Sequence, residues 1–200
     1  MVESNRAWPR FVFNNSRRDP LGCRCDLLPA APRFALSMTF PGLQLIDQEL
    51  FDAVALRAQA SERLRMNFNL HQESDQVQRF LNVMQPGTYV RPHRHSRHGT
   101  GEGFECFVVL QGSIGVLLFD DNGTGRRQVR LDAAGPVRGL QLDEGVFHSL
   151  VALAPDSVIF ELKQGPYQPL ADKDFLAGFP NEGELESREQ ELEWRRLFDV

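Results

Sequence analysis

The chain has 200 residues, of which 42% are hydrophobic and 24% charged, and its formal net charge is −5. These values are typical of one globular domain with extensions, and the acidic balance argues against a nucleic-acid partner, because phosphate binding needs a basic surface. No apolar run reaches the roughly 18 residues of a membrane span, so no membrane partner is expected.

The cysteines indicate a reducing environment. Cys23, Cys25 and Cys106 are odd in number and one of them is isolated, which does not suit a disulfide framework. We therefore expect a cytoplasmic protein. Cys23 and Cys25 could form half of a metal site, but no second pair follows them, so two incidental thiols are the favoured interpretation.

Residues 1–40 differ in composition from the rest of the chain. Arginines and prolines are scattered through them, and neither helical nor strand periodicity persists. We predict a loosely structured N-terminal extension. Met38 lies just before the globular pattern begins, so one hypothesis is that translation starts there and the upstream stretch is an over-called start.

A short N-terminal helix is predicted at the start of the folded region. Asp47 suits the N-cap position, and Leu50 and Val54 follow it at helical spacing on one face. The folded domain itself is expected to span residues 43–180.

Short strand-like segments fill most of that domain. They cover residues 65–71, 77–84, 105–110, 113–119, 129–131, 139–142, 149–153 and 158–162. Gln111 and Gly112 separate two of these segments and predict a two-residue hairpin turn. Many short strands at close spacing predict a mainly β protein built as an antiparallel sandwich or barrel.

The C-terminal residues 181–200 have a different pattern. Glu184 to Asp199 is rich in charge, with scattered apolar residues such as Leu192 and Trp194. This composition favours a charged helical tail on the surface.

Four residues of the predicted β domain form a pattern that suits a metal ion. His93 and His95, two positions apart on a strand, project from the same face. Glu105 on the next strand and His148 on a later one can converge on the same point. Three imidazoles and a carboxylate suit one divalent transition metal, and zinc, iron, manganese and nickel all stay open.

The segment after His95 offers competing ligands. Glu102 could replace Glu105 as the carboxylate, but it lies between two glycines in a loop, whereas Glu105 begins a strand. We therefore favour Glu105. His98 lies in the same loop and is interpreted as a solvated histidine.

The spacing of these residues resembles the first motif of the cupin superfamily. That motif is Gly-x5-His-x-His, then Glu after three or four residues, then Gly after six more. The matching residues are Gly87, His93, His95, Glu105 and Gly112. This chain departs from the motif between His95 and Glu105, where nine residues stand in the gap.

The second cupin motif, Pro-x-Gly-x2-His-x3-Asn, is matched in part. Gly145 and His148 agree with it, whereas Asp143 and Ala152 stand in place of Pro and Asn. Neither replaced residue is a metal ligand in the family, so the resemblance implies that the site is retained.

A closer resemblance is to the WbuC family of cupin-fold metalloproteins. It is carried by residues 65–71, 85–95, 107–110 and 165–167, and it covers about residues 43–180. The resemblance implies a single antiparallel cupin β-barrel of the jelly-roll type, a bound metal and a homodimer. The family is associated with bacterial surface-polysaccharide gene clusters, and its reaction is poorly defined.

The same resemblance points to further candidates around the metal. His71 matches a WbuC-like position and is either an acid–base or substrate-binding group or a hydrogen-bonded structural histidine. Arg65, Asn67 and Asn69 share this ambiguity, and Arg65 and Arg91 could hold an anionic or hydroxylated ligand.

The long segment Ser96 to Phe104 is where we expect a distinctive substrate to be recognised. The favoured function is a metal-dependent enzyme that acts on a small polar or sugar-derived substrate. The alternatives are a binding or sensor module that holds metal and ligand without catalysis, and a sandwich in which the metal only stabilises the fold.

Overall fold

The computed structural model describes residues 41–95, 103–124, 126–167 and 173–199. The chain divides into two units, Met1–Leu43 and Gln44–Val200, and the description below concerns the second. The predictions made for residues 1–40, including those on Met38 and the two N-terminal cysteines, lie outside the described residues.

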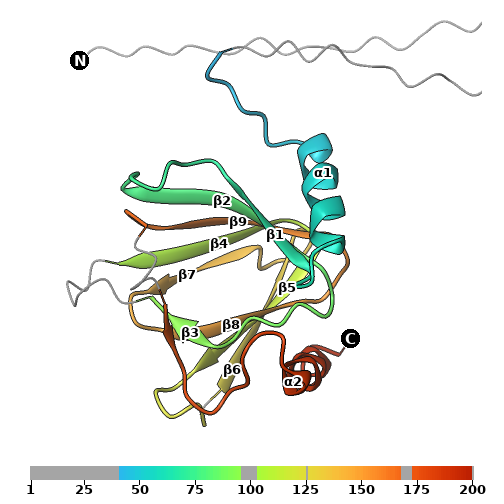
Figure 1. The fold of residues 1–200 in the computed structure, drawn as a ribbon, viewed down its shortest axis with the longest axis vertical. Coiled ribbons are helices and arrows are strands. Elements are labelled where there is room, and N and C mark those ends of the chain that lie inside the picture. Colours follow the sequence, from blue (N-terminus) through green and yellow to red (C-terminus); the bar gives the residue numbers. More distant parts are fainter. Residues whose placement is uncertain (1–40, 96–102, 125, 168–172, 200) are drawn as a thin grey trace, which may run out of the picture. The chain divides into compact units, whose positions relative to one another are not determined.

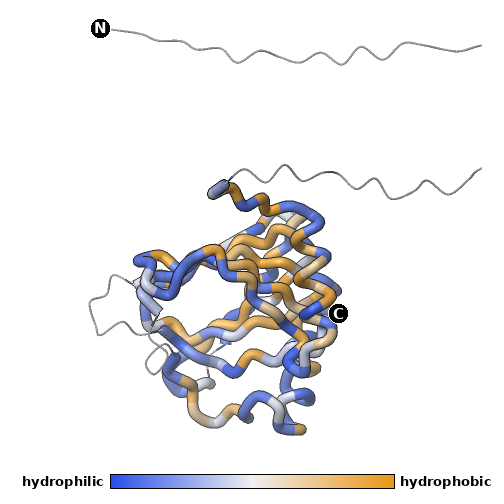
Figure 2. The backbone as a smooth tube through the Cα atoms, turned by 45° about the horizontal axis from the view of Figure 1, so that its top comes forward, coloured by the Kyte–Doolittle hydropathy of each residue, from blue (hydrophilic) through white to orange (hydrophobic). Residues whose placement is uncertain are grey.

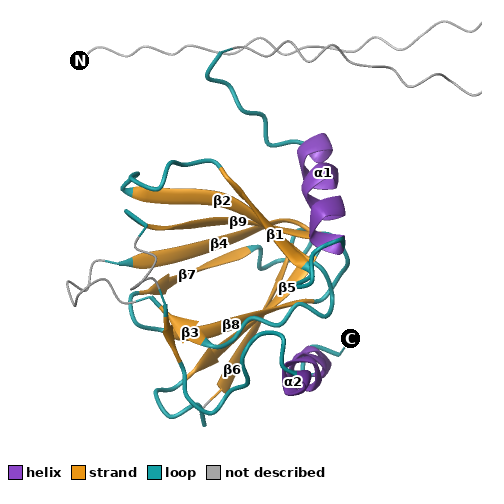
Figure 3. Ribbon diagram, in the orientation of Figure 1, coloured by secondary structure: helices purple, strands orange, loops and turns teal. Residues whose placement is uncertain are grey.

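Two five-stranded antiparallel sheets make up the folded unit (Figures 1 and 3). In order across the first sheet, the strands are β1 (Arg65–Asn69), β2 (Val77–Met84), β9 (Ser157–Gln164), β4 (Phe104–Gln111) and β7 (Gly139–Asp143). Across the second sheet they are β10 (Asp174–Phe175), β3 (His93–Arg94), β8 (Phe147–Ala152), β5 (Ser113–Phe119) and β6 (Arg126–Asp132). The predicted mainly β, antiparallel, cupin-like architecture is confirmed.

The hairpin predicted at Gln111 and Gly112 is wrong. β4 belongs to the first sheet and β5 to the second, so these residues carry the chain from one sheet to the other. Gly112 has a φ of +73°, and a Cβ there would clash with Ser157 Oγ. Glycine is needed at this close crossing between the sheets. Any other residue would be strained at this positive φ, and its Cβ would have no space.

Helix α1 (Gln48–Gln59) covers the outer face of the first sheet. Asp47 caps it as predicted, because its Oδ1 accepts a hydrogen bond of 3.0 Å from Leu50 N. The buried side of the helix packs on outward-facing residues of the sheet, and this cluster comprises Phe51, Val54, Ala55, Ala58, Leu81, Val83 and Val158. β2 is therefore covered on its outer face as well as its inner one.

Helix α2 (Leu185–Arg196) packs on the outer face of the second sheet. Trp194 is 1% exposed and stacks on Tyr89, with ring centroids 5.4 Å apart. The predicted helix is present, but it is anchored to the sheet by a large buried aromatic residue. In the part of the chain that the structure describes, neither helix combines the length and apolar character needed to cross a membrane.

The apolar core lies between the inner faces of the two sheets. It comprises Met84, Val90, Phe107, Val109, Ile114, Val116, Leu131, Leu142, Leu150, Ala152 and Ile159. Hydrophobic stretches of the chain gather in the body of the folded unit, and many turns at its margin are hydrophilic (Figure 2). The inner faces also carry buried polar residues, and these form the site described next.

Candidate metal centre

Three histidines come together on the inner face of the second sheet. His93 on β3 lies directly opposite His148 on β8, and His95 follows two residues after His93. One ligand atom from each of the three lies within 4.8 Å of the others. The cluster that the sequence predicted is therefore compact enough to hold one metal ion.

Backbone carbonyls fix the orientation of two of these rings. His93 Nδ1 lies 2.9 Å from Arg91 O, and His148 Nδ1 lies 3.0 Å from Val146 O. An Nδ1–H that donates to a carbonyl leaves the lone pair on Nε2, which is the arrangement of a metal-ligating histidine. The local backbone thus prepares both rings to bind through Nε2.

Glu105 faces the same point from β4 in the first sheet. Its Oε1 lies 3.4 Å from His95 Nε2, and its Oε2 lies 3.0 Å from His148 Nε2. His148 therefore has an oxygen next to each ring nitrogen, a carbonyl at Nδ1 and a carboxylate at Nε2. Buried imidazoles and a buried carboxylate fit a divalent metal at this place.

The pKa values of His93 and Glu105 are both shifted in the direction that favours metal binding. Burial lowers the pKa of His93 well below its usual value, and the nearby positive charge of Lys173 lowers it further. Burial alone would raise the pKa of Glu105, but the charge of His148 and hydrogen bonds from His148 and His95 hold it well below its usual value. A neutral imidazole and an ionised carboxylate are the metal-binding forms.

A second buried acid, Glu161 on β9, lies beside Glu105. Burial and the charge of Glu105 raise the pKa of Glu161 well above its usual value, which favours its neutral form. Sequence reasoning missed this residue. Glu161 alternates with apolar residues along β9, and such alternation normally assigns the polar face to solvent. Here the opposite face is covered by α1, so the polar face is the inner one.

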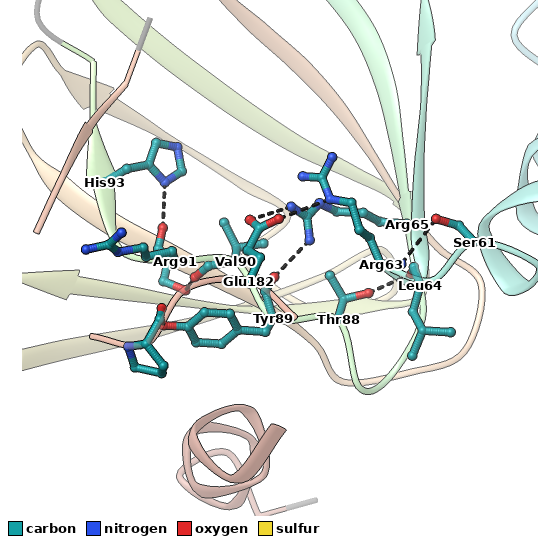
Figure 4. A network of polar contacts seen from close by, with 12 residues as sticks. Ser61, Arg63, Leu64, Arg65, Thr88, Tyr89, Val90, Arg91, His93 and Glu182 are labelled. Atoms are coloured by element: carbon teal, nitrogen blue, oxygen red, sulfur yellow. Dashed lines mark hydrogen bonds and ion pairs between the residues drawn. The ribbon is translucent and has the colours of Figure 1, made fainter. Parts of the chain in front are cut away.

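The two predicted ligand-binding arginines are held by the protein itself. Arg65 donates to Tyr89 O at 2.8 Å and pairs with Glu182 at 2.6 Å (Figure 4). Arg91 donates to Asn181 Oδ1 at 2.6 Å. Arg65 from β1 and Arg91 from the segment before β3 thus both contact the segment that leads into α2.

The other predicted residues lie at different distances from the histidines. His71 is not one of the clustered histidines, and its Nδ1 accepts a hydrogen bond of 3.0 Å from Arg79 N. Asn67 is paired with Asn82 across β1 and β2, and Asn69 is paired with Phe80. Both Asn67 and Asn69 are exposed, on the strand at the edge of the first sheet.

The competing ligands Glu102 and His98 lie outside the described residues, as does most of the segment Ser96 to Phe104. At the described end of this segment, Gly103 N donates to Glu144 Oε2 at 3.2 Å. Gly145 N donates to His95 O at 3.0 Å, which joins the turn before His148 to the segment that carries the other two histidines.

Comparison with protein families matches residues 46–131 to a family described as a domain of unknown function, DUF6016. Comparison with curated proteins gives no match.

Among solved structures, the capsular polysaccharide assembling protein CapF from Staphylococcus aureus is similar at 17% identity and a TM-score of 0.48, over 58% of this chain and 32% of that one. KdgF from Halomonas sp. is similar at 20% identity and a TM-score of 0.39, over 52% of this chain and 82% of that one. An oxalate oxidase in complex with the substrate analogue glycolate is similar at 13% identity and a TM-score of 0.43, over 58% of this chain and 57% of that one. The chain thus spans about a third of the length of CapF, and these similarities concern the fold alone.

Proposed function

We propose that this chain binds one divalent metal through His93, His95, His148 and Glu105. The observation that carries the proposal is the convergence of three imidazoles within 4.8 Å, two of them oriented by backbone carbonyls. The contacts of Glu105 with His95 and His148 support it as the fourth ligand.

We further propose that the site acts catalytically on a small polar, sugar-derived substrate. A metal bound by these four residues would supply a Lewis acid for a substrate oxygen. Around it, the pKa of Glu161 is raised by burial and by the charge of Glu105, and the buried inner faces of the sheets exclude bulk water. The resemblance to the WbuC family supports a role in bacterial surface-polysaccharide metabolism. The homodimer and the cytoplasmic location expected from the sequence stay predictions.

Metal analysis of protein purified without an affinity tag tests the proposed site. We expect about one equivalent of a divalent metal per chain, and we expect His93→Ala and His148→Ala to weaken metal binding by on the order of tenfold or more. His71→Ala is the matched control, because that histidine lies outside the cluster. A chain without stoichiometric metal after growth in metal-replete medium would contradict the proposal.

Turnover then separates catalysis from binding. Metal-loaded protein is incubated with a panel of sugar acids, sugar phosphates and sugar nucleotides, and substrate loss is followed over time. Loss that disappears in His93→Ala supports an enzyme. A ligand that binds at the metal and stays unchanged would instead support the non-catalytic binding or sensor module.

A further inference from the structure

The segment that leads into the first of the clustered histidines belongs to no strand. Residues 85–92 connect β2 to β3, and β3 itself has two residues. On one side β3 pairs with the two residues of β10, and on the other, within the described residues, it pairs with β8 through His93 and His148 alone. Such short ladders fix the position of His93, but the direction of its ring also depends on how the segment before it is held.

Three consecutive carbonyl groups before His93 each have a different partner. Val90 O accepts a hydrogen bond of 2.6 Å from Ser149 Oγ, and Pro92 O accepts one of 2.9 Å from the backbone N–H that directly follows β10. Between them, Arg91 O lies 2.9 Å from His93 Nδ1 (Figure 4). The carbonyl that orients the His93 ring therefore lies between two carbonyls that other parts of the fold hold in place.

The local sequence leaves the Arg91 carbonyl little freedom once its neighbours are held. A peptide group is planar, so a hydrogen bond at Val90 O fixes the plane that also contains Arg91 N. Only φ and ψ of Arg91 separate this plane from Arg91 O, and the proline that follows confines that ψ to extended values. Holding Val90 O therefore restricts the direction of Arg91 O, and through it the ring of His93.

Ser149 lies on the opposite face of β8 from His148. Neighbouring residues of a strand point to opposite faces, so the Ser149 side chain points away from the clustered histidines. Phe147 and Val151, on the same outward face, belong to the apolar cluster under α2, and Ser149 is 0% exposed among them. Because burying a hydroxyl is unfavourable unless it is hydrogen-bonded, packing alone would favour an apolar side chain at this position. The hydrogen bond to Val90 O gives the hydroxyl a role there.

One strand thus contributes to the placement of two metal-binding rings. His148 belongs to β8 and lies directly opposite His93, with ring centroids 4.6 Å apart. We propose, on the basis of the metal site proposed above, that the next residue of β8, Ser149, is a positioning residue for His93. By holding Val90 O it directs the carbonyl that orients the His93 ring, so that Nε2 faces the metal. Ser149 acts through the backbone and does not touch the metal.

Binding of cobalt(II) to the metal-free chain tests the proposal, because the visible absorption of this ion depends on its ligands and their geometry. We expect Ser149→Ala to weaken cobalt binding by about tenfold, the lower end of the range for partners of ligand histidines, and to change the absorption spectrum. Ser113→Ala is the matched control. Ser113 is 3% exposed and also donates to a carbonyl, at 3.1 Å, but it lies at the other end of β5 from Leu118, which pairs with His148. This variant should keep both affinity and spectrum.

Combination with His93→Ala shows whether Ser149 acts through that histidine. Two changes that act through one group are not additive, so Ser149→Ala should cause no further loss of cobalt affinity in the His93→Ala chain. Ser149→Ala alone should lose no more affinity than His93→Ala alone. An equal loss from Ser149→Ala in both backgrounds, or an unchanged affinity and spectrum in Ser149→Ala alone, overturns the proposal.

A second variant, Ser149→Cys, keeps the proposal testable if the alanine variant fails to fold. A thiol fills nearly the same space as the hydroxyl but donates only weakly, so the packing is kept while the hydrogen bond to Val90 O is weakened. We expect severalfold weaker cobalt binding and an altered spectrum. A serine that only fills space would leave both unchanged, and that result overturns the proposal.

The unmodified chain and His93→Ala separate this proposal from the metal site itself. Cobalt that binds stoichiometrically to the unmodified chain and more weakly to His93→Ala, but equally well to Ser149→Ala, rejects the positioning role and leaves the metal site intact. Absence of cobalt binding in the unmodified chain rejects the metal site, and the positioning role, which rests on it, with it.

Discussion

At the scale of single residues, Glu161 links the stability of the fold to pH. Its pKa in the folded chain is raised well above the ordinary value of 4.5, first by burial and then by the charge of Glu105. Above pH 4.5 the unfolded chain releases this proton while the folded chain keeps it. Folding therefore takes up a proton, and the contribution of Glu161 to stability falls as pH rises.

We therefore predict that Glu161→Gln gains stability over the unmodified chain as the pH of a metal-free solution rises from about 5 to about 8. The advantage should grow by at most about 1.4 kcal/mol per pH unit. Urea unfolding at several pH values measures it, and Glu189→Gln, at an exposed position of α2, is the control. A constant difference between Glu161→Gln and the unmodified chain across this range would contradict the prediction.

Two arginines that share one acid offer a second prediction at this scale. Glu182 pairs with Arg63 at 3.0 Å and with Arg65 at 2.6 Å, but the Arg63 side chain is 59% exposed and that of Arg65 only 8% (Figure 4). Arg65 also donates to Tyr89 O. Removing a buried charged donor loses more than removing an exposed one.

We expect Arg65→Ala to destabilise the fold by about 2–3 kcal/mol and Arg63→Ala by less than about 1 kcal/mol. Chemical denaturation of both variants measures the difference, and high salt should reduce the effect of Arg63 proportionally more. Equal losses in the two variants would show that burial does not govern the strength of these pairs.

At the scale of elements, α1 depends on the cap that the sequence predicted. Asp47 Oδ1 accepts from Leu50 N, and no second acceptor for that N–H is seen among the described residues of the first turn. Asp47→Ala should therefore lower the free energy of unfolding by about 1 kcal/mol, whereas Asp47→Ser should keep most of it. Thermal melts followed by circular dichroism compare the two, and an unchanged alanine variant would show that packing of α1 alone sets its stability.

Local pattern predicted some elements well and others not at all. The strands at 77–84 and 113–119 have the predicted bounds, because turn residues follow each of them and β-forming residues make up most of each. β3 and β10 have two residues each, which is too short for any periodicity. The error at Gln111 and Gly112 has another cause. The local sequence predicts the turn correctly, but it does not determine whether β4 and β5 pair, because each strand pairs with strands that are distant in the sequence.

The residues of the candidate site also fall into those that the sequence identifies and those that it does not. The histidines and Glu105 could be found because fixed spacing and residue chemistry identify them. Glu161 could not, because the alternation along β9 does not tell which face is inward until α1 is seen to cover the other. The charge of Arg65 predicts a ligand-binding group, and only the structure shows that Glu182 already pairs with it.

At the scale of the whole molecule, the metal site joins the two sheets. The histidines lie in the second sheet or directly follow its strand β3, whereas Glu105 belongs to β4 of the first. Glu105 and His148 are 43 positions apart in the sequence, and folding brings Glu105 Oε2 to 3.0 Å from His148 Nε2. A metal bound by all four residues therefore connects both layers of the folded state.

Because the folded chain gathers ligands that the unfolded chain holds apart, metal should stabilise the fold by mass action. At a free metal concentration about a hundredfold above the dissociation constant, we expect a gain of about 2.7 kcal/mol, or roughly 5–10 °C in Tm for a domain of this size. Differential scanning fluorimetry with zinc, iron(II), manganese and nickel, before and after chelation, measures the shift. His71→Ala should keep it, and His93→Ala and His148→Ala should lose it. A shift that persists in both cluster variants would place the metal elsewhere on the chain.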